Sequence, residues 1–336
     1  MEYISQLPQK ILVEKGAIEK VAKIAGGFGR DFIVVGDSVT KNLGGDAIAK
    51  NLGAKIILIQ DSKMEEVKKV ELEKTDCIVS FGGGKVIDVG KLAAHNKGVP
   101  FISVPTACSH DGIASMNASI IVDGDSKSFG ASTPVAIIAD LDIISKSPYR
   151  LTAAGAADVL SNYTAVADWR LAAEKGLEEY SEPIANLALS AADLVSANSL
   201  KIKNLEETGI KNLIWSLIFS GMAMSLHGSS RPASGAEHMF SHALDKLGKF
   251  GLHGEQVGIG TIFFACLHGL DWEKIKNTLN ILGAPITIKE INLDKDLFVE
   301  AMLKAKDVRK RYTVLEEKPL NREMIIKVGE EIGIVA

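Results

Sequence analysis

Four short apolar runs, rich in β-branched residues, alternate with helix-length segments in the first part of the chain. They are FIVVGD (32–37), AKIILIQ (54–60), CIVSFGG (77–83) and VPFISVPT (99–106). Runs that are apolar on both faces and spaced in this way are typical of a parallel sheet covered by helices on both sides. The segment 111–140 is expected to add a hairpin that turns at VDGD (122–125). We therefore predict an α/β, Rossmann-like domain over residues 1–147.

The pattern changes after residue 147. From YRLTAAGAADVLSNYT (149–164) onward, apolar residues recur three and four positions apart, and no strand alternation is evident. The sequence predicts an all-α domain over residues 148–336. Ligands of open α/β sheets bind beyond the carboxyl ends of the strands, so we expect a crevice there that the helical domain closes.

Composition narrows the possible partners. The chain has 336 residues, of which 46% are hydrophobic and 24% charged, and a formal net charge of -4. This balance is typical of a soluble globular protein and gives no basic field for nucleic acid. Neither a leader nor a membrane-spanning segment is expected. Three widely spaced cysteines (Cys77, Cys108 and Cys266) indicate neither a disulfide framework nor a CxxC metal site, which fits the cytoplasm.

A glycine triplet, Gly82, Gly83 and Gly84, lies where the third apolar run ends and a helix is expected to begin. The N-terminus of a helix offers unpaired N–H groups and a positive dipole end, both of which suit a phosphate. The dinucleotide fingerprint G-x-G-x-x-G and the Walker spacing are both absent. Close packing of a helix on a strand is the alternative explanation for the triplet.

Two aspartates lie near this loop. Asp37 ends another predicted strand, where a carboxylate can bind the ribose hydroxyls of a nucleotide or, alternatively, cap a helix. Its charge favours NAD over NADP, although Lys41 could offset that preference, and the sequence leaves the choice open. Asp88 either organises the glycine loop or pairs with Lys91. His110 follows the fourth run and could face the crevice.

The helical half contains candidate metal ligands. His238 and His242 lie four residues apart, so they share one helix face and either both bind a cation or divide between metal and substrate. Asp158 lies in an apolar run where an isolated carboxylate is costly to bury, and His253 begins another helix. One Asp and two His with an open position favour a catalytic Zn²⁺ site. The alternative is that these are ordinary core or surface histidines, and we predict a structural or surface position for His95, His227 and His268.

Five motifs resemble the iron-containing alcohol dehydrogenase and dehydroquinate synthase superfamily over nearly the whole chain. They are GGGKVIDVGKLAA (82–94), GVPFISVPTACSHDGIASMNASI (98–120), AADVLSNYTAVADW (156–169), GAEHMFSHALD (235–245) and HGEQVGIGTI (253–262). The resemblance implies a dehydroquinate synthase-like fold. It is greatest to the branch that reduces dihydroxyacetone phosphate to sn-glycerol 1-phosphate for archaeal ether lipids, although Met116 replaces a proline common in that branch.

The resemblance also implies roles for residues of the first half. It assigns the pyrophosphate of NAD(P)H to the glycine triplet and Lys85, with Asp88 in the same loop, and the adenosine ribose to Asp37. The nicotinamide half of the cofactor is assigned to three further residues, Thr106, Ser109 and Ser115.

In the second half, the resemblance assigns Zn²⁺ to Asp158, His238 and His253. His242 and Asp111 then contact the substrate and transfer the proton while the reduced nicotinamide supplies hydride. Family members usually assemble into homo-oligomers, which we expect here as well.

Three rival functions remain. A glycerol or polyol dehydrogenase would share the scaffold without a phosphate site, and no Arg or Lys cluster for a phosphate is evident; only His242, Lys85 and backbone N–H groups are candidates. A dehydroquinate synthase-like lyase would need more cationic residues near the metal than the helical half shows. A non-catalytic nucleotide sensor would be expected to lose a metal ligand, yet all three are present.

Overall fold

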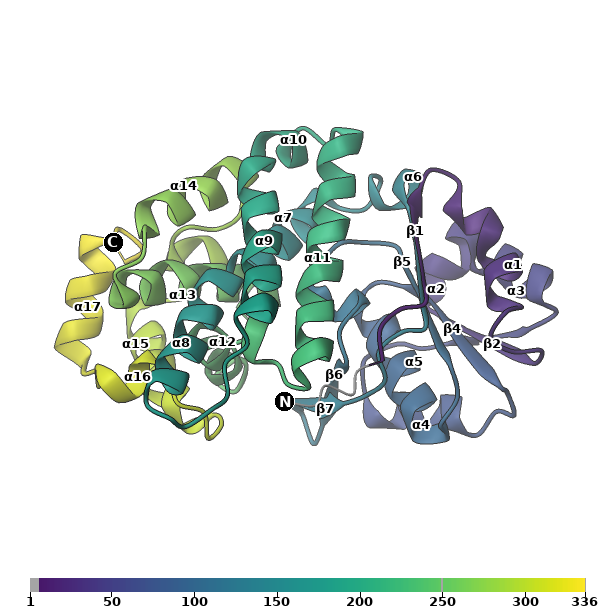
Figure 1. Ribbon diagram of the computed structural model, residues 1–336, viewed down its shortest axis with the longest axis horizontal. Helices are drawn as coiled ribbons and strands as arrows, with labels where there is room; N and C mark the ends of the chain where they lie inside the picture. Colours follow the sequence, from purple (N-terminus) through teal and green to yellow (C-terminus); the bar gives the residue numbers. More distant parts are fainter. Residues whose placement is uncertain (1–5, 249, 336) are drawn as a thin grey trace. The chain divides into compact units, whose positions relative to one another are not determined.

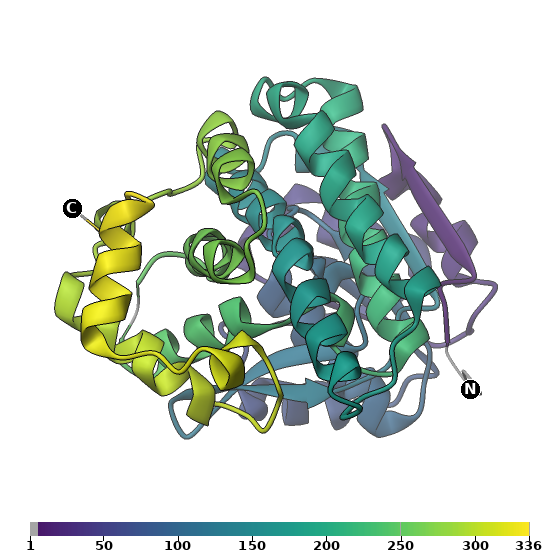
Figure 2. The ribbon, with the colours of Figure 1, turned by 60° about the vertical axis from the view of Figure 1, so that its left-hand side comes forward.

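The chain divides into two compact units. The structure is a computed structural model that describes residues 6–248 and 250–335 (Figures 1 and 2). Unit 1 comprises Met1–Leu151 and unit 2 Thr152–Ala336. The division falls inside a helix, four residues after the expected boundary at residue 147.

Six parallel strands form the sheet of unit 1, in the order β1-β8-β5-β4-β2-β3. Their bounds are β1 Lys10–Glu14, β2 Phe32–Gly36, β3 Lys55–Leu58, β4 Cys77–Gly82, β5 Phe101–Pro105 and β8 Ala136–Asp140. The four apolar runs are confirmed as β2, β3, β4 and β5. The outer strand β1 and its neighbour β8 were not predicted.

The predicted hairpin is also confirmed. Strands β6 (Asn117–Val122) and β7 (Asp125–Gly130) pair antiparallel as a separate two-stranded sheet. Asp123 and Gly124 at the turn have φ of 57° and 90°. Two consecutive positive φ angles match the twist of a tight hairpin, and Asp-Gly adopts them at low cost.

Helices cover both faces of the six-stranded sheet, and this explains the continuous apolar runs. Their bounds are α1 Val21–Ala25, α2 Ser38–Thr40, α3 Asp46–Leu52, α4 Met64–Glu71, α5 Gly84–Lys97 and α6 Leu141–Ile144. In β4, Ile78 packs into the core cluster that includes Val67 of α4 and Val86 of α5, whereas Cys77 and Val79 pack into the cluster on the opposite face. Successive strand residues point to opposite faces, so every position of β4 is buried.

Unit 2 is helical throughout the residues that the structure describes, as predicted. Its helices are α7 Tyr149–Leu160, α8 Asn162–Glu174, α9 Glu182–Ala197, α10 Ser199–Lys203, α11 Glu207–His227, α12 Ala236–Asp245, α13 His253–His268, α14 Trp272–Leu282, α15 Lys295–Lys304, α16 Val314–Glu317 and α17 Arg322–Glu331. Short 3-10 turns, η4 (Arg231–Ala233) and η6 (Ala305–Asp307), precede α12 and follow α15. Helix α15 packs on α12 through Phe298 and Phe240, whose ring centroids are 5.6 Å apart.

Helix α11 is the one described helix that is long and apolar enough, by length and composition, to cross a membrane. Within the structure, 67% of its apolar window is buried. Side chains such as Leu213, Leu217 and Ile218 have no exposed surface. This is the pattern of a helix at the centre of a bundle, and composition alone had not indicated it.

Candidate active site

The three predicted metal ligands of unit 2 come together from three helices. Asp158 lies on α7, His238 on α12 and His253 at the start of α13, and one ligand atom of each lies within 4.8 Å of the others. Asp158 Oδ1 is 3.5 Å from His238 Nε2 and 3.8 Å from His253 Nε2. Ligand atoms about 2 Å from a common Zn²⁺ have similar mutual separations, so the residues fit such an ion.

Burial across this trio is uneven. The side chain of Asp158 is 4% exposed and that of His238 12%, whereas that of His253 is 36% exposed. A closed structural site would bury all of its ligands. The trio is therefore accessible on the side of His253, as a site that receives a substrate must be.

A hydrogen-bond network orients both histidines through their second ring nitrogen. Glu237 Oε1 lies 2.9 Å from His238 Nδ1, and the hydroxyl of Ser241 lies 3.1 Å from His253 Nδ1. Glu237 is fully buried and also accepts hydrogen bonds from Gly235 N and Thr164 Oγ1. Because the Nδ1 atoms are engaged, both Nε2 atoms face Asp158. Sequence analysis missed Glu237 and Ser241, although both lie inside the GAEHMFSHALD motif.

Neighbouring carboxylates favour positive charge on His238. Burial alone would lower the pKa of His238, but its hydrogen bonds to Asp158 and Glu237 raise that pKa to about 9. His242 lies on the same face of α12 outside the trio, with its ring centroid 5.9 Å from that of His253. Burial and the neighbouring His253 and Arg309 hold the pKa of His242 well below its ordinary value.

In unit 1, the expected cofactor residues meet at the carboxyl ends of neighbouring strands. Asp37 follows β2, Gly82 ends β4, and Thr106 follows β5, and the sheet order places β4 between β2 and β5. The N–H of Thr106 donates to the carbonyl of Gly82 over 3.0 Å. The sheet order also reverses between β2 and β4, which is where ligands of such sheets bind.

The three glycines differ in their surroundings. A Cβ on Gly82 would lie 2.5 Å from Val86, and one on Gly84 would lie 2.1 Å from His110 Nε2. A Cβ on Gly83 would meet no atom within 4 Å. Close packing therefore explains Gly82 and Gly84, whereas the space beside Gly83, the residue that precedes α5, is open to a ligand.

Asp37 caps helix α2, as the alternative interpretation held. Its Oδ1 accepts from Val39 N, Thr40 N and Thr40 Oγ1 at 2.8–3.1 Å. Its Oδ2 lies 3.4 Å from Lys85 Nζ, while Lys41 pairs with Asp46 instead. Burial would raise the pKa of Asp37, but the bonds from Thr40 and the charge of Lys85 lower it overall. Lys85, rather than Lys41, is the cation that offsets the charge of Asp37.

The loop that contains Asp111 is held by a buried lysine. Lys91 Nζ donates to the carbonyls of Gly112 (2.5 Å) and Asn117 (2.7 Å) and lies 3.7 Å from Asp88 Oδ1, so the predicted Asp88–Lys91 pair forms. The structure buries Asp88 beside Ser119 N, whose hydrogen bond it accepts, rather than directing it at the glycine triplet. Lys91 thus fixes the short turn that begins at Asp111.

The remaining residues of this loop are placed as follows. His110 Nδ1 accepts from Gly112 N, and its ring packs against Gly84. Ser115 is 2% exposed, and its N–H donates to the carbonyl of Asp111. Ser109 is half-buried. His110 is therefore in contact with the glycine loop, and its sequence position alone had left its orientation open.

The other three histidines have structural surroundings, as predicted. His268 Nε2 bonds to buried Asp168 Oδ1 at 2.8 Å. The ring of His227 packs on Trp169, with centroids 4.4 Å apart, and exposed His95 bonds to Ser132.

Three arginines of unit 2 gather around the residues that precede α12, and sequence analysis missed them. Arg311 donates to the carbonyl of Ser234, the residue before Gly235, whose N–H bonds to Glu237. Arg309 and Arg311 also share the hydroxyl of Ser230, at 3.4 and 3.0 Å. The third arginine, Arg231, follows Ser230 directly. The argument that the helical half lacks cations near the metal motifs was wrong, because the cluster is assembled from residues about 80 positions apart.

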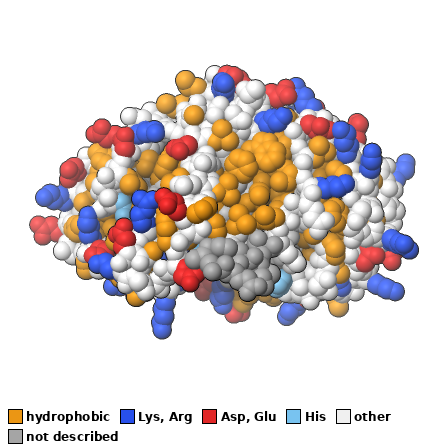
Figure 3. Space-filling view, in the orientation of Figure 1, with side chains coloured by type: hydrophobic (Ala, Val, Ile, Leu, Met, Phe, Trp, Pro, Cys, Tyr) orange, Lys and Arg blue, Asp and Glu red, His pale blue; other side chains and the backbone are white. Residues whose placement is uncertain are grey.

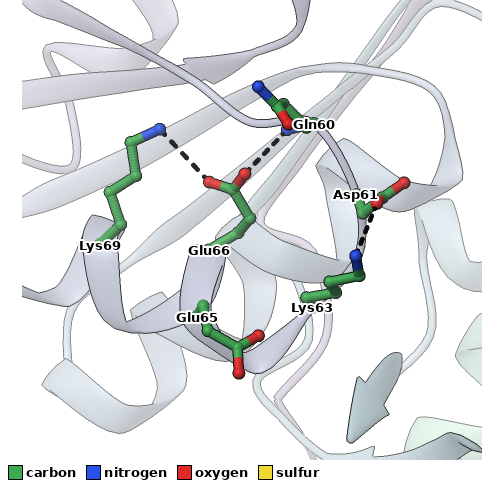
Figure 4. Close-up of a pocket in the computed structure, with 6 residues that line it drawn as sticks. All are labelled: Gln60, Asp61, Lys63, Glu65, Glu66 and Lys69. Carbon is green, nitrogen blue, oxygen red and sulfur yellow. Dashed lines mark hydrogen bonds and ion pairs between the residues drawn. The ribbon is translucent and has the colours of Figure 1, made fainter. Parts of the chain in front are cut away.

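Elsewhere the charges are dispersed or paired. On the face shown in Figure 3, lysine and arginine side chains alternate with aspartate and glutamate. A surface hollow of about 650 Å³ beside β3 and α4 is lined by charged groups, but Figure 4 shows Glu66 bonded to Gln60 and Lys69, and Lys63 paired with Asp61. Four of its five charged side chains are thus paired within the lining.

Comparison with known proteins defines the family. Residues 12–148 match the family model described as iron-containing alcohol dehydrogenase. The chain is 42% identical to the glycerol-1-phosphate dehydrogenase [NAD(P)+] of Pyrococcus furiosus, over 99% of this chain and 100% of that protein. The equivalent enzyme of Thermococcus kodakarensis is 43% identical, with 99% of each chain covered.

Solved structures show the same fold. The glycerol dehydrogenase of Schizosaccharomyces pombe superposes with a TM-score of 0.82 at 19% identity, over 98% of this chain and 90% of that chain. The maleylacetate reductase of Agrobacterium tumefaciens gives 0.76 at 14% identity, over 99% and 98%. The chain therefore belongs, within the iron-containing alcohol dehydrogenases, to the glycerol-1-phosphate dehydrogenase family.

Proposed function

We propose that this protein catalyses the NAD(P)-dependent interconversion of dihydroxyacetone phosphate and sn-glycerol 1-phosphate at a zinc site. The observation that carries the proposal is full-length similarity: the enzymes of Pyrococcus furiosus and Thermococcus kodakarensis, both named glycerol-1-phosphate dehydrogenase [NAD(P)+], are 42% and 43% identical over 99% of the chain. The presence of Asp158, His238 and His253 within 4.8 Å of one another supports it.

The cofactor is proposed to bind at the carboxyl edge of the sheet in unit 1. The open space beside Gly83 and the N-terminus of α5 suit the pyrophosphate. Asp37 and Lys85 would lie at the adenosine ribose, and Thr106, Ser109 and Ser115 at the nicotinamide half. Because Lys85 accompanies Asp37, the pair is compatible with either NAD or NADP.

The metal is proposed to be Zn²⁺ held by Asp158, His238 and His253. A zinc ion bound there would polarise the carbonyl oxygen, and a bound reduced nicotinamide would supply hydride to C2. Glu237 and Ser241 keep the two histidines oriented for this role. The exposed side of His253 leaves room for the substrate.

The remaining proton must reach the substrate oxygen from the protein. We assign this transfer to His242, on the same face of α12 as His238, and to Asp111, at the head of the turn that Lys91 fixes. His242 lies in unit 2 and Asp111 in unit 1.

The test is reduction of dihydroxyacetone phosphate and of unphosphorylated dihydroxyacetone by zinc-loaded protein, with NADH and NADPH as cofactors. We expect a strong preference for the phosphate ester, and sn-glycerol 1-phosphate as the product in a chiral assay. Equal or better use of dihydroxyacetone would instead indicate a polyol dehydrogenase on the same fold. Size-exclusion chromatography with light scattering tests the further proposal that the enzyme is a homo-oligomer, and cell fractionation tests the proposed cytoplasmic location.

A further inference from the structure

Unit 2 contains a cluster of three arginines that the metal chemistry does not use. Arg231 lies in η4, and Arg309 and Arg311 lie in the segment between η6 and α16. The hydroxyl of Ser230 accepts from both Arg309 and Arg311, and the carbonyl of Ser234 accepts from Arg311. The segment 305–313 is therefore fastened to the residues that precede α12.

The positive charge of this cluster is only partly neutralised. Arg231 pairs with Glu178, its Nη2 lying 2.6 Å from Oε1. Across the described parts of the chain, neither Arg309 nor Arg311 forms an ion pair with a carboxylate. Burial, followed by the charges of Arg309 and Arg231, lowers the pKa of Arg311 to about 9. A bound anion would relieve this repulsion.

Two buried polar atoms of the same region, one on Arg231 and one on Ser234, also lack a hydrogen-bond partner among the described residues. Arg231 is 1% exposed, and its Nη1 has no hydrogen-bond partner; the Oγ of Ser234, 5% exposed, has none either. Buried polar groups are nearly always paired, so two unpaired atoms three residues apart in the sequence indicate a ligand. A phosphate monoester supplies several acceptor oxygens and two negative charges, which matches guanidinium donors.

Hydrogen bonds connect the arginine cluster to the residues that orient the metal ligands. Ser234 is followed by Gly235, whose N–H bonds to Glu237, and Glu237 bonds to the ligand His238. Buried Asp168 accepts from Ala236 N and from Val314 N, both at 2.7 Å. One carboxylate thus links the start of α12 to the end of the arginine segment, and an anion held by the cluster would lie at a fixed place relative to the metal ligands.

We propose that Arg309 and Arg311 bind the phosphate of the three-carbon substrate, with Arg231 and Ser234 behind them as additional donors. The inference rests on the proposed function and supplies the phosphate contacts that the sequence alone did not. The two half-buried side chains, Arg309 and Arg311, are the ones that a ligand can reach. The cluster would make this enzyme a phosphate-ester dehydrogenase rather than a polyol dehydrogenase.

The kinetic test compares Arg309→Met and Arg309→Lys with Lys310→Met, a matched control at the exposed neighbouring position. The readout is the ratio of kcat/KM for dihydroxyacetone phosphate to that for dihydroxyacetone. We expect this ratio to fall about 10- to 100-fold in Arg309→Met, the loss typical of a charge-assisted hydrogen bond, and less in Arg309→Lys. Lys310→Met should keep the wild-type ratio. A wild-type ratio in both Arg309 variants would overturn the inference.

A binding measurement separates this inference from the proposed function. Calorimetry with inorganic phosphate and with dihydroxyacetone phosphate, on zinc-loaded wild type, Arg309→Met and Arg311→Met, needs no turnover. Weaker binding of both anions by the variants, with unchanged zinc content and melting temperature, supports the cluster as the phosphate site. If Arg311→Met unfolds because it loses its bond to Ser234, Arg309→Met decides alone. If the wild type prefers dihydroxyacetone, the proposed function fails, and calorimetry still supports or overturns the anion site.

Discussion

The two candidate binding regions are built in different ways. At the sheet edge of unit 1, the strand order positions the loop, and the open space lies beside the backbone of Gly83. At the trio of unit 2, side chains from three helices are held by other buried side chains, chiefly Glu237 and Ser241. A backbone site is vulnerable to added bulk, whereas a side-chain site is vulnerable to the loss of single atoms. We therefore expect added side-chain bulk to impair the region in unit 1, and the removal of single polar groups to impair the region in unit 2.

The largest effect is expected at the metal trio. Asp158→Asn removes the negative charge that lies 3.5 Å from His238 and 3.8 Å from His253. We expect bound zinc to be lost and kcat to fall by about three orders of magnitude or more. Metal analysis of the purified variant and steady-state kinetics check this, with Asp193→Asn, on the exposed side of α9, as a control. Full zinc occupancy in Asp158→Asn would contradict the assignment.

A smaller effect is expected at Glu237, which contacts the ligand His238 rather than the metal itself. Glu237→Gln keeps the size of the side chain but weakens its bond to His238 Nδ1. We expect zinc affinity to fall about 10- to 100-fold, as is common when a carboxylate partner of a ligand histidine is removed. Competition with a chelator measures the affinity. An unchanged dissociation constant would show that Glu237 serves only the packing around Gly235.

The glycine triplet allows a matched comparison within unit 1. Gly82→Ala would force a Cβ to 2.5 Å from Val86, so we expect a loss of about 1–3 kcal/mol in the free energy of unfolding. Gly83→Ala meets no atom, so its stability should change little while the KM for NAD(P)H rises about tenfold. Chemical denaturation and cofactor titration separate the two effects. Normal cofactor affinity in Gly83→Ala would place the pyrophosphate elsewhere.

The smallest effect is expected on cofactor choice. Lys85 lies 3.4 Å from Asp37 Oδ2, and its side chain is 43% exposed. Removing its charge in Lys85→Ala leaves Asp37 to repel a 2′-phosphate, so the preference for NADH over NADPH should increase about three- to tenfold. The ratio of kcat/KM for the two cofactors measures it. A shift towards NADPH would exclude the placement of this pair at the ribose.

The sequence predicted most of the fold because each predicted strand is a continuous apolar run that can be identified without its neighbours. Every position of β4 is buried, so its apolar run needs no knowledge of partners. Strand β1 was missed because KILVE has one buried residue and pairs with β8, more than 120 positions away. Short amphipathic segments of this kind are ambiguous without the partner strand.

The site was predictable to the extent that its residues share short motifs. Residue type and spacing indicated Asp158, the histidine pair and His253, the family resemblance chose His238 from that pair, and the structure brings the three ligands together. The arginine cluster was not found, because Ser230 and Arg311 are 81 positions apart and only tertiary packing brings their segments together. Glu237 was missed although it adjoins His238, since sequence does not reveal which acid is buried.

The segment 305–313 is held at both ends, and Asp168 holds one of them. One end continues from α15, which packs on α12 through Phe298 and Phe240, and the other is held where Val314 N donates to Asp168 Oδ1. The same carboxylate holds Ala236, two residues before His238. We therefore expect that this segment can be replaced by another loop of equal length that carries different charges. Such a loop could bind a different ester, while α15 and Asp168 still hold its two ends and the start of α12.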